Sequence, residues 1–188
     1  MPRAGLTADS VVEAAAGIAD ERGASGLSLA AVAERLGVRV PSLYKHVGGL
    51  DDLQRRIALA GLRDLTRELG AATVGRSGPD ALRACAVVWR AYAREHPGRY
   101  AAVQRAPDPV DTELAAASAE LTGLVLAVLR EYGLGEDGTV HAARAVRSAL
   151  HGFVSLEAAG GFGLRQDVDE SYARLVDLLD AGLRGSGR

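Results

Sequence analysis

The sequence of 188 residues predicts an all-α protein of about nine helices. Alanine and leucine outnumber valine, isoleucine and the aromatic residues, and this composition favours helices. No stretch alternates apolar and polar residues for long enough to indicate a β-strand. Apolar residues instead recur three and four positions apart, in segments that glycine and proline separate. A hydrophobic content of 48% also allows a sizeable core.

The first predicted helix runs from Ala8 to Arg22. Thr7 can cap it, and Asp9 in the first turn suits the positive end of the helix dipole. Its apolar positions form one stripe at helical spacing, which indicates a face packed against other helices. These positions are Val11, Val12, Ala15, Ile18 and Ala19.

Two short helices joined by a tight turn are predicted between Ser28 and His46. Ser28 is the expected cap of the first, which should end near Gly37, because glycine tolerates the left-handed conformation of a helix end. Pro41 fits only the first turn of the second helix, since it has no amide hydrogen. The exposed side of this pair then carries a polar, cationic and aromatic set of residues. The set comprises Arg39, Val40, Ser42, Tyr44, Lys45 and His46.

This exposed helix is short enough to lie across the major groove of DNA, which is about 12 Å wide. Ala33 and Gly37 are small and four residues apart, so the two helices can cross closely, as a helix-turn-helix requires. An ordinary helical hairpin with a solvated face is the alternative. For Tyr44, the alternative is a ring packed in the core with only its hydroxyl in water.

A fourth helix is predicted from Leu50 to Ala72, and it opens the second of two expected domains, residues 1–49 and 50–188. A helix of roughly 20 residues spans about 30 Å, so it can act as a lever between a DNA domain and a regulatory domain. Five further helices are expected at residues 79–96, 98–105, 109–132, 140–159 and 168–183. Segments 73–80 and 133–139 are predicted connectors, and the GGFG sequence at 160–163 is a predicted turn.

Charge and cysteine content limit the functions that the sequence allows. The net charge is −2, and residues 1–56 contain seven Lys or Arg against seven Asp or Glu, so DNA binding must depend on local arrangement. The single cysteine and the absence of His and Cys at ligand spacing predict no disulfide and no metal site. We expect no catalytic constellation, no cofactor, no signal peptide and no membrane span, and therefore a cytoplasmic protein that is not an enzyme.

The segment LGVRVPSLYKHVGGLDDL, from Leu36 to Leu53, resembles the DNA-binding domain of the TetR family of transcriptional repressors. The resemblance implies that the hydroxyls of Ser42 and Tyr44 contact DNA phosphates or nearby base edges and that His46 approaches the DNA backbone. Further DNA-binding candidates are Ser28, Arg39, Val40 and Lys45. Val40 and Ala30 differ from base-reading residues of the tetracycline repressor, so the operator sequence cannot be transferred. Leu50 stands where many relatives have a phosphate-binding lysine.

The stretch SALHGF at 148–153, with Trp89 and HPGRY upstream, resembles a TetR-type C-terminal ligand-binding domain. We expect a largely apolar small-molecule effector, although each aromatic candidate could equally be part of the core. The last two helices carry apolar residues on more than one side, which predicts a homodimer interface. The ligand candidates are Trp89, Tyr92, Tyr100, Gln104, His151, Phe153 and Phe162. The interface candidates are Val146, Leu150, Tyr172, Leu175 and Leu179.

Together these features predict a homodimeric repressor. Its N-terminal three-helix helix-turn-helix domain would bind a palindromic operator, and its C-terminal helical domain would bind the effector and dimerise. The alternative is a helical ligand-binding or interaction protein without specific DNA binding, which the neutral charge balance permits.

Overall fold

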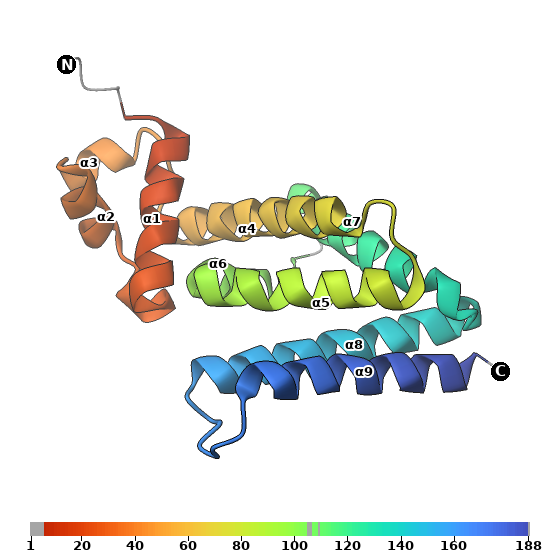
Figure 1. The fold of residues 1–188 in the computed structure, drawn as a ribbon. Helices are drawn as coiled ribbons and strands as arrows, with labels where there is room; N and C mark the ends of the chain where they lie inside the picture. The colour runs from red at the N-terminus through yellow and green to blue at the C-terminus, as the bar shows by residue number, and fades with distance from the viewer. Residues whose placement is uncertain (1–5, 105–106, 109, 188) are drawn as a thin grey trace. The chain divides into compact units, whose positions relative to one another are not determined.

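The computed structural model describes residues 6–104, 107–108 and 110–187, and over these ranges it is helical and contains no strand. Figure 1 shows the nine α-helices of this part of the chain in order. They are α1 (Ala8–Arg22), α2 (Leu29–Leu36), α3 (Val40–Leu43), α4 (Leu50–Thr73), α5 (Gly78–Glu95), α6 (Pro97–Val103), α7 (Thr112–Leu129), α8 (Gly135–Ala158) and α9 (Val168–Ser186). Two short 3₁₀ helices, η1 (Ala24–Gly26) and η2 (Arg130–Tyr132), connect them. The all-α prediction is confirmed.

Local sequence signals set most helix starts. Thr7 Oγ1 accepts a hydrogen bond from the amide of Ser10, and Ser10 Oγ accepts one from the amide of Thr7, so a reciprocal capping box begins α1. Asp167 caps α9 with a single bond, in which its Oδ1 accepts from the amide of Glu170. These side chains satisfy amides that have no partner within the helix.

Two predicted helix starts were wrong. Helix α7 begins at Thr112 rather than residue 109, and its start is marked by Asp111, whose carboxylate accepts a hydrogen bond from the amide of Leu114. Helix α8 begins at Gly135 and absorbs most of the segment expected to be a connector. Glu136 and Asp137 lie in its first turn, where negative charge is favoured and offsets the poor helix propensity of the neighbouring glycines.

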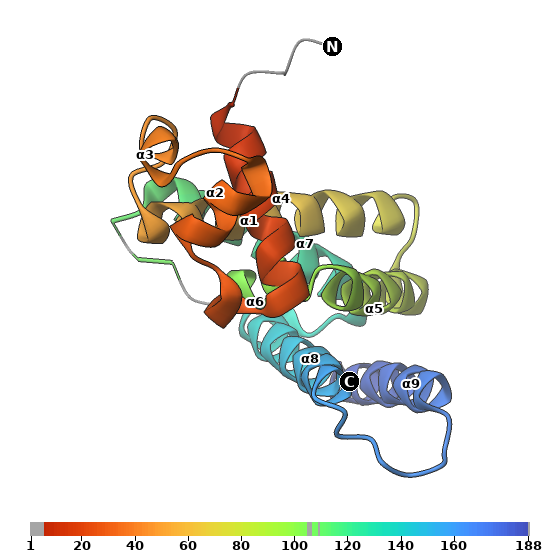
Figure 2. The ribbon, with the colours of Figure 1, turned by 90° about the vertical axis from the view of Figure 1, so that its left-hand side faces the viewer.

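The chain divides into two compact units. The first contains the chain up to Asp64 together with Glu95–Ser118, and the second contains Leu65–Arg94 and the chain from Ala119 onward. Helices α4 and α7 each contribute residues to both units. Figure 2 turns the view so that α1, α2 and α3 of the first unit face the reader.

The core of the first unit gathers the predicted apolar stripes of α1 and α2. Val11, Ile18, Val32 and Leu43 are among its fully buried side chains, and Ile57 of α4 packs with them. The amphipathic patterns of the sequence therefore converge on one cluster, which fixes α2 and α3 against α1 and the start of α4.

Helix α7 is the most apolar helix of the described residues. The stretch Thr112–Tyr132 is long and apolar enough to cross a membrane by length and composition alone, with a mean hydropathy of 1.5 and only 17% of that window buried. Glu120 interrupts it. A single such helix is weak evidence for a membrane span, since core helices of soluble proteins share these properties.

Candidate DNA-binding surface and ligand-binding core

The turn between α2 and α3 has the geometry of a helix-turn-helix. Ser28 Oγ accepts a hydrogen bond of 3.1 Å from the amide of Ala31 and caps α2. Gly37 has a φ of +66°, which a side chain would strain, and the Val38 amide closes the helix end on the Ala33 carbonyl at 2.9 Å. The turn therefore needs glycine at this position.

Helix α3 is shorter than predicted. It ends at Leu43 rather than His46, and residues 44–46 form a hydrogen-bonded turn in which the His46 amide donates to the Leu43 carbonyl at 2.8 Å. The Val47 amide bonds the same carbonyl at 3.0 Å. The bond from His46 spans three residues, as in a 3₁₀ helix, and such bonds are common in the last turn of an α-helix. Tyr44 and Lys45 therefore still continue the surface of α3.

One side of α3 is buried and the other is open. Leu43 and Val47, four residues apart, are 0% and 3% exposed and anchor the segment. Tyr44 is 58% exposed, so the core-packing alternative for this ring is excluded. Arg39 and Lys45 are exposed and make no ion pair with any described residue, which leaves both cations available to an anionic partner.

The beginning of α4 is unsuited to phosphate binding. Leu50 starts the helix, and Asp51 and Asp52 follow in its first turn. Asp52 Oδ2 accepts the Gly48 amide at 2.8 Å and holds the Arg56 guanidinium at 3.0 Å. Both Arg56 and a loop amide are therefore engaged by this carboxylate, and its pKa is held below the usual value, chiefly by the Gly48 hydrogen bond.

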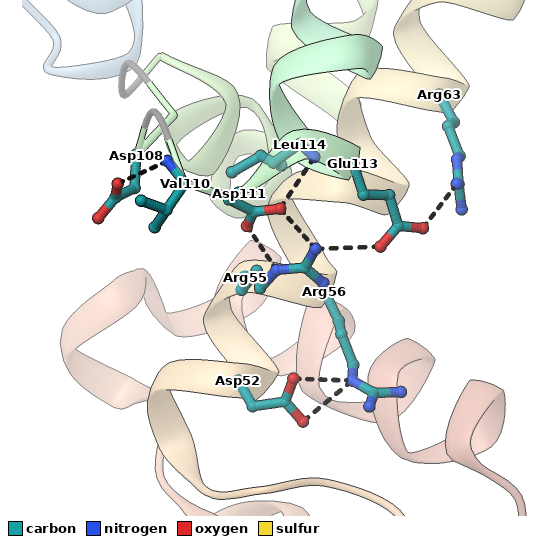
Figure 3. A network of polar contacts seen from close by, with 9 residues as sticks. All are labelled: Asp52, Arg55, Arg56, Arg63, Asp108, Val110, Asp111, Glu113 and Leu114. Atoms are coloured by element: carbon teal, nitrogen blue, oxygen red, sulfur yellow. Dashed lines mark hydrogen bonds and ion pairs between the residues drawn. The ribbon is translucent and has the colours of Figure 1, made fainter.

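Further arginines of the first unit are also paired within the protein. Arg55 donates to both oxygens of Asp111 at 2.5 and 2.6 Å and to Glu113 at 3.0 Å, and Arg63 donates to Glu113 (Figure 3). Arg35 pairs with Glu21. Of the Arg and Lys residues described in the first unit, Arg22, Arg39 and Lys45 make no salt bridge, and the last two of these lie on α3 or directly beside it.

Helix α6 is locked against the end of α1. A Cβ atom placed on Gly98 would lie 2.2 Å from the backbone carbon of Ala19, so only glycine allows this approach. The Arg99 amide donates to Asp20 Oδ1 at 2.9 Å, and the Arg99 side chain lies 3.2 Å from the same carboxylate. The HPGRY sequence thus fixes α6 to the helix that supports the helix-turn-helix.

The second unit contains most of the predicted ligand residues. Trp89 and Tyr92 are 3% and 1% exposed on α5. The Phe153 ring lies 4.7 Å from that of Phe162 and 4.9 Å from that of Tyr172. His151 lies half-buried, with its Nε2 3.4 Å from Ser155 Oγ. Tyr100 and Gln104 lie on α6 and at its end, in the first unit.

A buried arginine that sequence reasoning missed holds the aromatic group together. Arg90, only 9% exposed, donates to Glu157 at 2.8 and 2.6 Å and to Asp169 at 2.7 Å. Its guanidinium carbon lies 4.9 Å from the centre of the Tyr172 ring and 5.7 Å from that of Phe153. Such cation–π contacts are favourable when desolvated. The hydrogen bonds from Arg90 lower the pKa of Glu157.

Three of the five interface candidates are buried within the protomer. Val146 and Leu150 are 3% and 1% exposed, and Tyr172 is buried with its hydroxyl donating to the Ala86 carbonyl at 2.7 Å. Side chains without exposed surface add little to an interface. Leu175 and Leu179 keep part of their surface, and Leu178 beside them is 71% exposed.

The comparisons with known proteins agree with this geometry. A model of "Bacterial regulatory proteins, tetR family" matches residues 11–56, and a model of "Tetracyclin repressor-like, C-terminal domain" matches residues 82–179. The chain is 37% identical to the HTH-type transcriptional regulator YobS of Bacillus subtilis over 183 residues, covering 97% of this chain and 95% of that protein. The chain belongs to the TetR family of bacterial regulatory proteins.

Solved structures share the fold of this TetR-family chain. A protein of unknown function from Rhodococcus sp. RHA1 superimposes with a TM-score of 0.82 at 23% identity, covering 97% of this chain and 98% of the other. The TetR-family protein ActR of Streptomyces coelicolor, in complex with (S)-DNPA, superimposes with a TM-score of 0.66 at 19% identity over 98% and 100% of the two chains. TetR-family membership makes the chain a DNA-binding transcriptional regulator of a class that is normally not enzymatic.

Proposed function

We propose that this regulator is a repressor that binds a palindromic operator as a homodimer and is released by a small-molecule effector. The exposed α3 face carries the proposal. It presents Arg39, Tyr44 and Lys45 to solvent on a segment anchored by Leu43 and Val47. In the same unit Arg35, Arg55 and Arg56 are already paired with carboxylates. An unpaired cation and a projecting hydroxyl suit the phosphates and base edges of a major groove.

Within this face the residues have different proposed roles. Lys45 and Tyr44 would bind phosphates and set the register, together with Ser42, His46 and the Ser28 hydroxyl, whose oxygen already accepts from Ala31 but whose hydrogen remains available. Arg39 would read a base. Val40 can offer only apolar contact, such as to a thymine methyl group.

Mobility-shift assays with DNA flanking the gene test these roles. Lys45→Ala and Tyr44→Phe should weaken binding to all sequences, and Lys45→Ala should also reduce the dependence of affinity on salt. Arg39→Ala should cost about 1 to 3 kcal/mol at one base pair and relax preference there. Arg76→Ala, which removes an exposed cation from the connector after α4, is the matched control and should bind normally.

Two outcomes would refute parts of this assignment. Binding no tighter than to random DNA at low salt would favour a helical interaction protein without a specific operator. Identical selected sequences for the wild type and Arg39→Ala would limit Arg39 to the DNA backbone.

For the effector we propose the second unit, with Trp89, Tyr92, His151, Phe153 and Phe162 as contacts, in line with the ligand complex of ActR. The Oγ1 of Thr66 on α4 is buried and has no hydrogen-bond partner among the described residues, so a ligand could supply one. Tyr100 and Gln104, in the first unit, would act only if the effector also reaches α6.

Trp89 is the only tryptophan, so its fluorescence reports on this site directly. A compound that raises the melting temperature should change Trp89 emission and lower operator affinity. Thr66→Val should weaken binding of a polar effector without unfolding the protein, since it removes a hydroxyl that has no partner among the described residues. A stabilising compound that leaves operator affinity unchanged would contradict induction through α4.

A further inference from the structure

The first unit contains a cleft that the proposed DNA and effector sites do not use. It has a volume of about 650 Å³ and lies among the end of α1, η1, the first turns of α4, helix α6 and the start of α7. None of the seven residues predicted to bind the effector lines it. We propose that this cleft is a separate binding site for an amphiphilic organic monocation.

The size and the walls of the cleft suit a small organic molecule. Pockets for such ligands have volumes of about 300 to 1,000 Å³ and are mainly apolar, with a few polar groups that orient the ligand. Here the apolar wall comes from the end of η1 and from α4, α6 and α7, and part of it belongs to the core of the first unit or packs against it. It includes Leu27, Ile57, Ala58, Ala102 and Leu114.

The charge on the rim selects the sign of the ligand. Asp51, Asp108 and Asp111 line the cleft, and Arg55 is its only cation among the described residues. Arg55 is already neutralised, because it donates to both oxygens of Asp111 and to Glu113 (Figure 3). Among the described lining residues, an anionic ligand therefore finds no free positive group.

Two carboxylates remain to attract a cation. Asp51 makes no hydrogen bond or ion pair with the described residues, and the Asp108 carboxylate accepts one hydrogen bond, from the Val110 amide at 3.0 Å. A ligand with an apolar body and a single positive charge would bury its body against Leu27 and Ile57 and keep its charge near these carboxylates. Opposite charges at such a rim attract, and the attraction weakens with salt.

Tetraphenylphosphonium and tetraphenylborate provide the test, because they have nearly the same size and shape and opposite charge. Isothermal titration calorimetry on the full chain, without DNA, should show the phosphonium binding at least tenfold more tightly than the borate, with affinity falling as salt rises. The result does not depend on operator binding. Equal affinity for the two ions, or no binding of the phosphonium, would overturn the proposal.

Two cleft variants locate the bound cation. The double variant Asp51→Asn, Asp108→Asn should weaken phosphonium binding by about threefold to tenfold, as expected for pairs open to solvent. Asp137→Asn on α8 removes the same charge outside the cleft and should leave affinity unchanged.

Ala101 is exposed at the cleft, so Ala101→Trp should fill it and abolish binding, whereas Ala116→Trp, at an exposed position of α7 outside the cleft lining, should not. Circular dichroism checks that both tryptophan variants fold. If they do not, the phosphonium affinity of the double asparagine variant still tests the site. Phosphonium affinity that survives both cleft variants but is lost in Phe153→Ala would place the cation in the second unit and refute the cleft site.

Discussion

At the scale of single residues, the residue type at some positions follows from local backbone preferences, whereas at others it follows only from packing against distant parts of the chain. Ser28 and Gly37 could be assigned from the sequence, since a cap and a left-handed helix end have strong residue preferences. Gly98 could not, because its need for glycine arises from a contact with Ala19, which is distant in the sequence. Arg90 was missed for the same reason, as its partners Glu157 and Asp169 lie on other helices.

Gly98→Ala tests the close approach of α6 and α1. The added methyl group would sit 2.2 Å from backbone atoms of Ala19, so the two helices must separate, and we expect a loss of about 2 kcal/mol or more in the free energy of unfolding. Urea denaturation followed by circular dichroism measures this loss. Gly123→Ala is the matched control, because nothing lies within 4 Å of its added methyl group and α7 should gain up to about 1 kcal/mol. Equal effects of the two substitutions would disprove the contact.

At the scale of elements, hydrophobic periodicity was informative and boundaries were less so. The stripes of α1, α2 and α4 predicted which residues form the first core, including Val11, Val32 and Ile57. The C-terminal end of α3 and the starts of α7 and α8 differ from the predicted boundaries. Helix α7 begins after its cap Asp111, and α8 begins at a glycine followed by two acidic residues, so the glycine and proline signals in the sequence did not mark these two starts. Capping depends on side-chain orientation, which periodicity does not encode.

The Arg90 cluster joins three elements, α5, α8 and the start of α9, and predicts a dependence of stability on pH. The pKa of Glu157 is lowered in the folded state by its hydrogen bonds to Arg90, so the folded protein holds this proton less tightly than the unfolded chain. The stabilisation is therefore fully present above the ordinary glutamate pKa of about 4.3 and is lost as the pH falls through the lower folded value.

Glu157→Gln should accordingly cost about 1 to 3 kcal/mol at pH 7, and the difference from the wild type should shrink as the pH falls below about 4. Urea unfolding at a series of pH values gives both curves. Glu170→Gln removes an exposed pair with Arg174 on α9 and should change stability by less than about 0.5 kcal/mol. A wild-type advantage over Glu157→Gln that stayed constant down to pH 3 would contradict a lowered pKa.

At the scale of the whole molecule, family and fold were predictable from the sequence, whereas the ligand and interface residues remain predictions. The short motif from Leu36 to Leu53 was enough to suggest the family because a helix-turn-helix is built from local contacts. Ligand and interface residues depend on which face of an apolar helix remains open after folding. Val146 and Leu150 turned out to be buried inside the protomer, and Tyr100 lies in a different unit from Trp89.

The dimer proposal therefore now rests on the exposed side of α9. Leu178 is 71% exposed, and Leu175 and Leu179 beside it are half-buried, so a second copy of the chain would remove an apolar strip from water. Two recognition helices must lie about 34 to 36 Å apart to enter successive major grooves, and only a dimer places two of them on one operator.

Leu178→Arg should put a charge into this interface without disturbing the protomer, since the side chain is already mostly in solvent. We expect monomers by light scattering, an unchanged far-ultraviolet circular dichroism spectrum, and operator affinity lower by at least a hundredfold, because one half-site must then bind alone. Val87→Arg makes the same change on α5, where the side chain is 65% exposed, and should remain dimeric and bind DNA normally. If the Leu178→Arg protein stayed dimeric at micromolar concentration, the interface would not lie on this face of α9. If it were a monomer with full operator affinity, DNA binding would not depend on dimerisation.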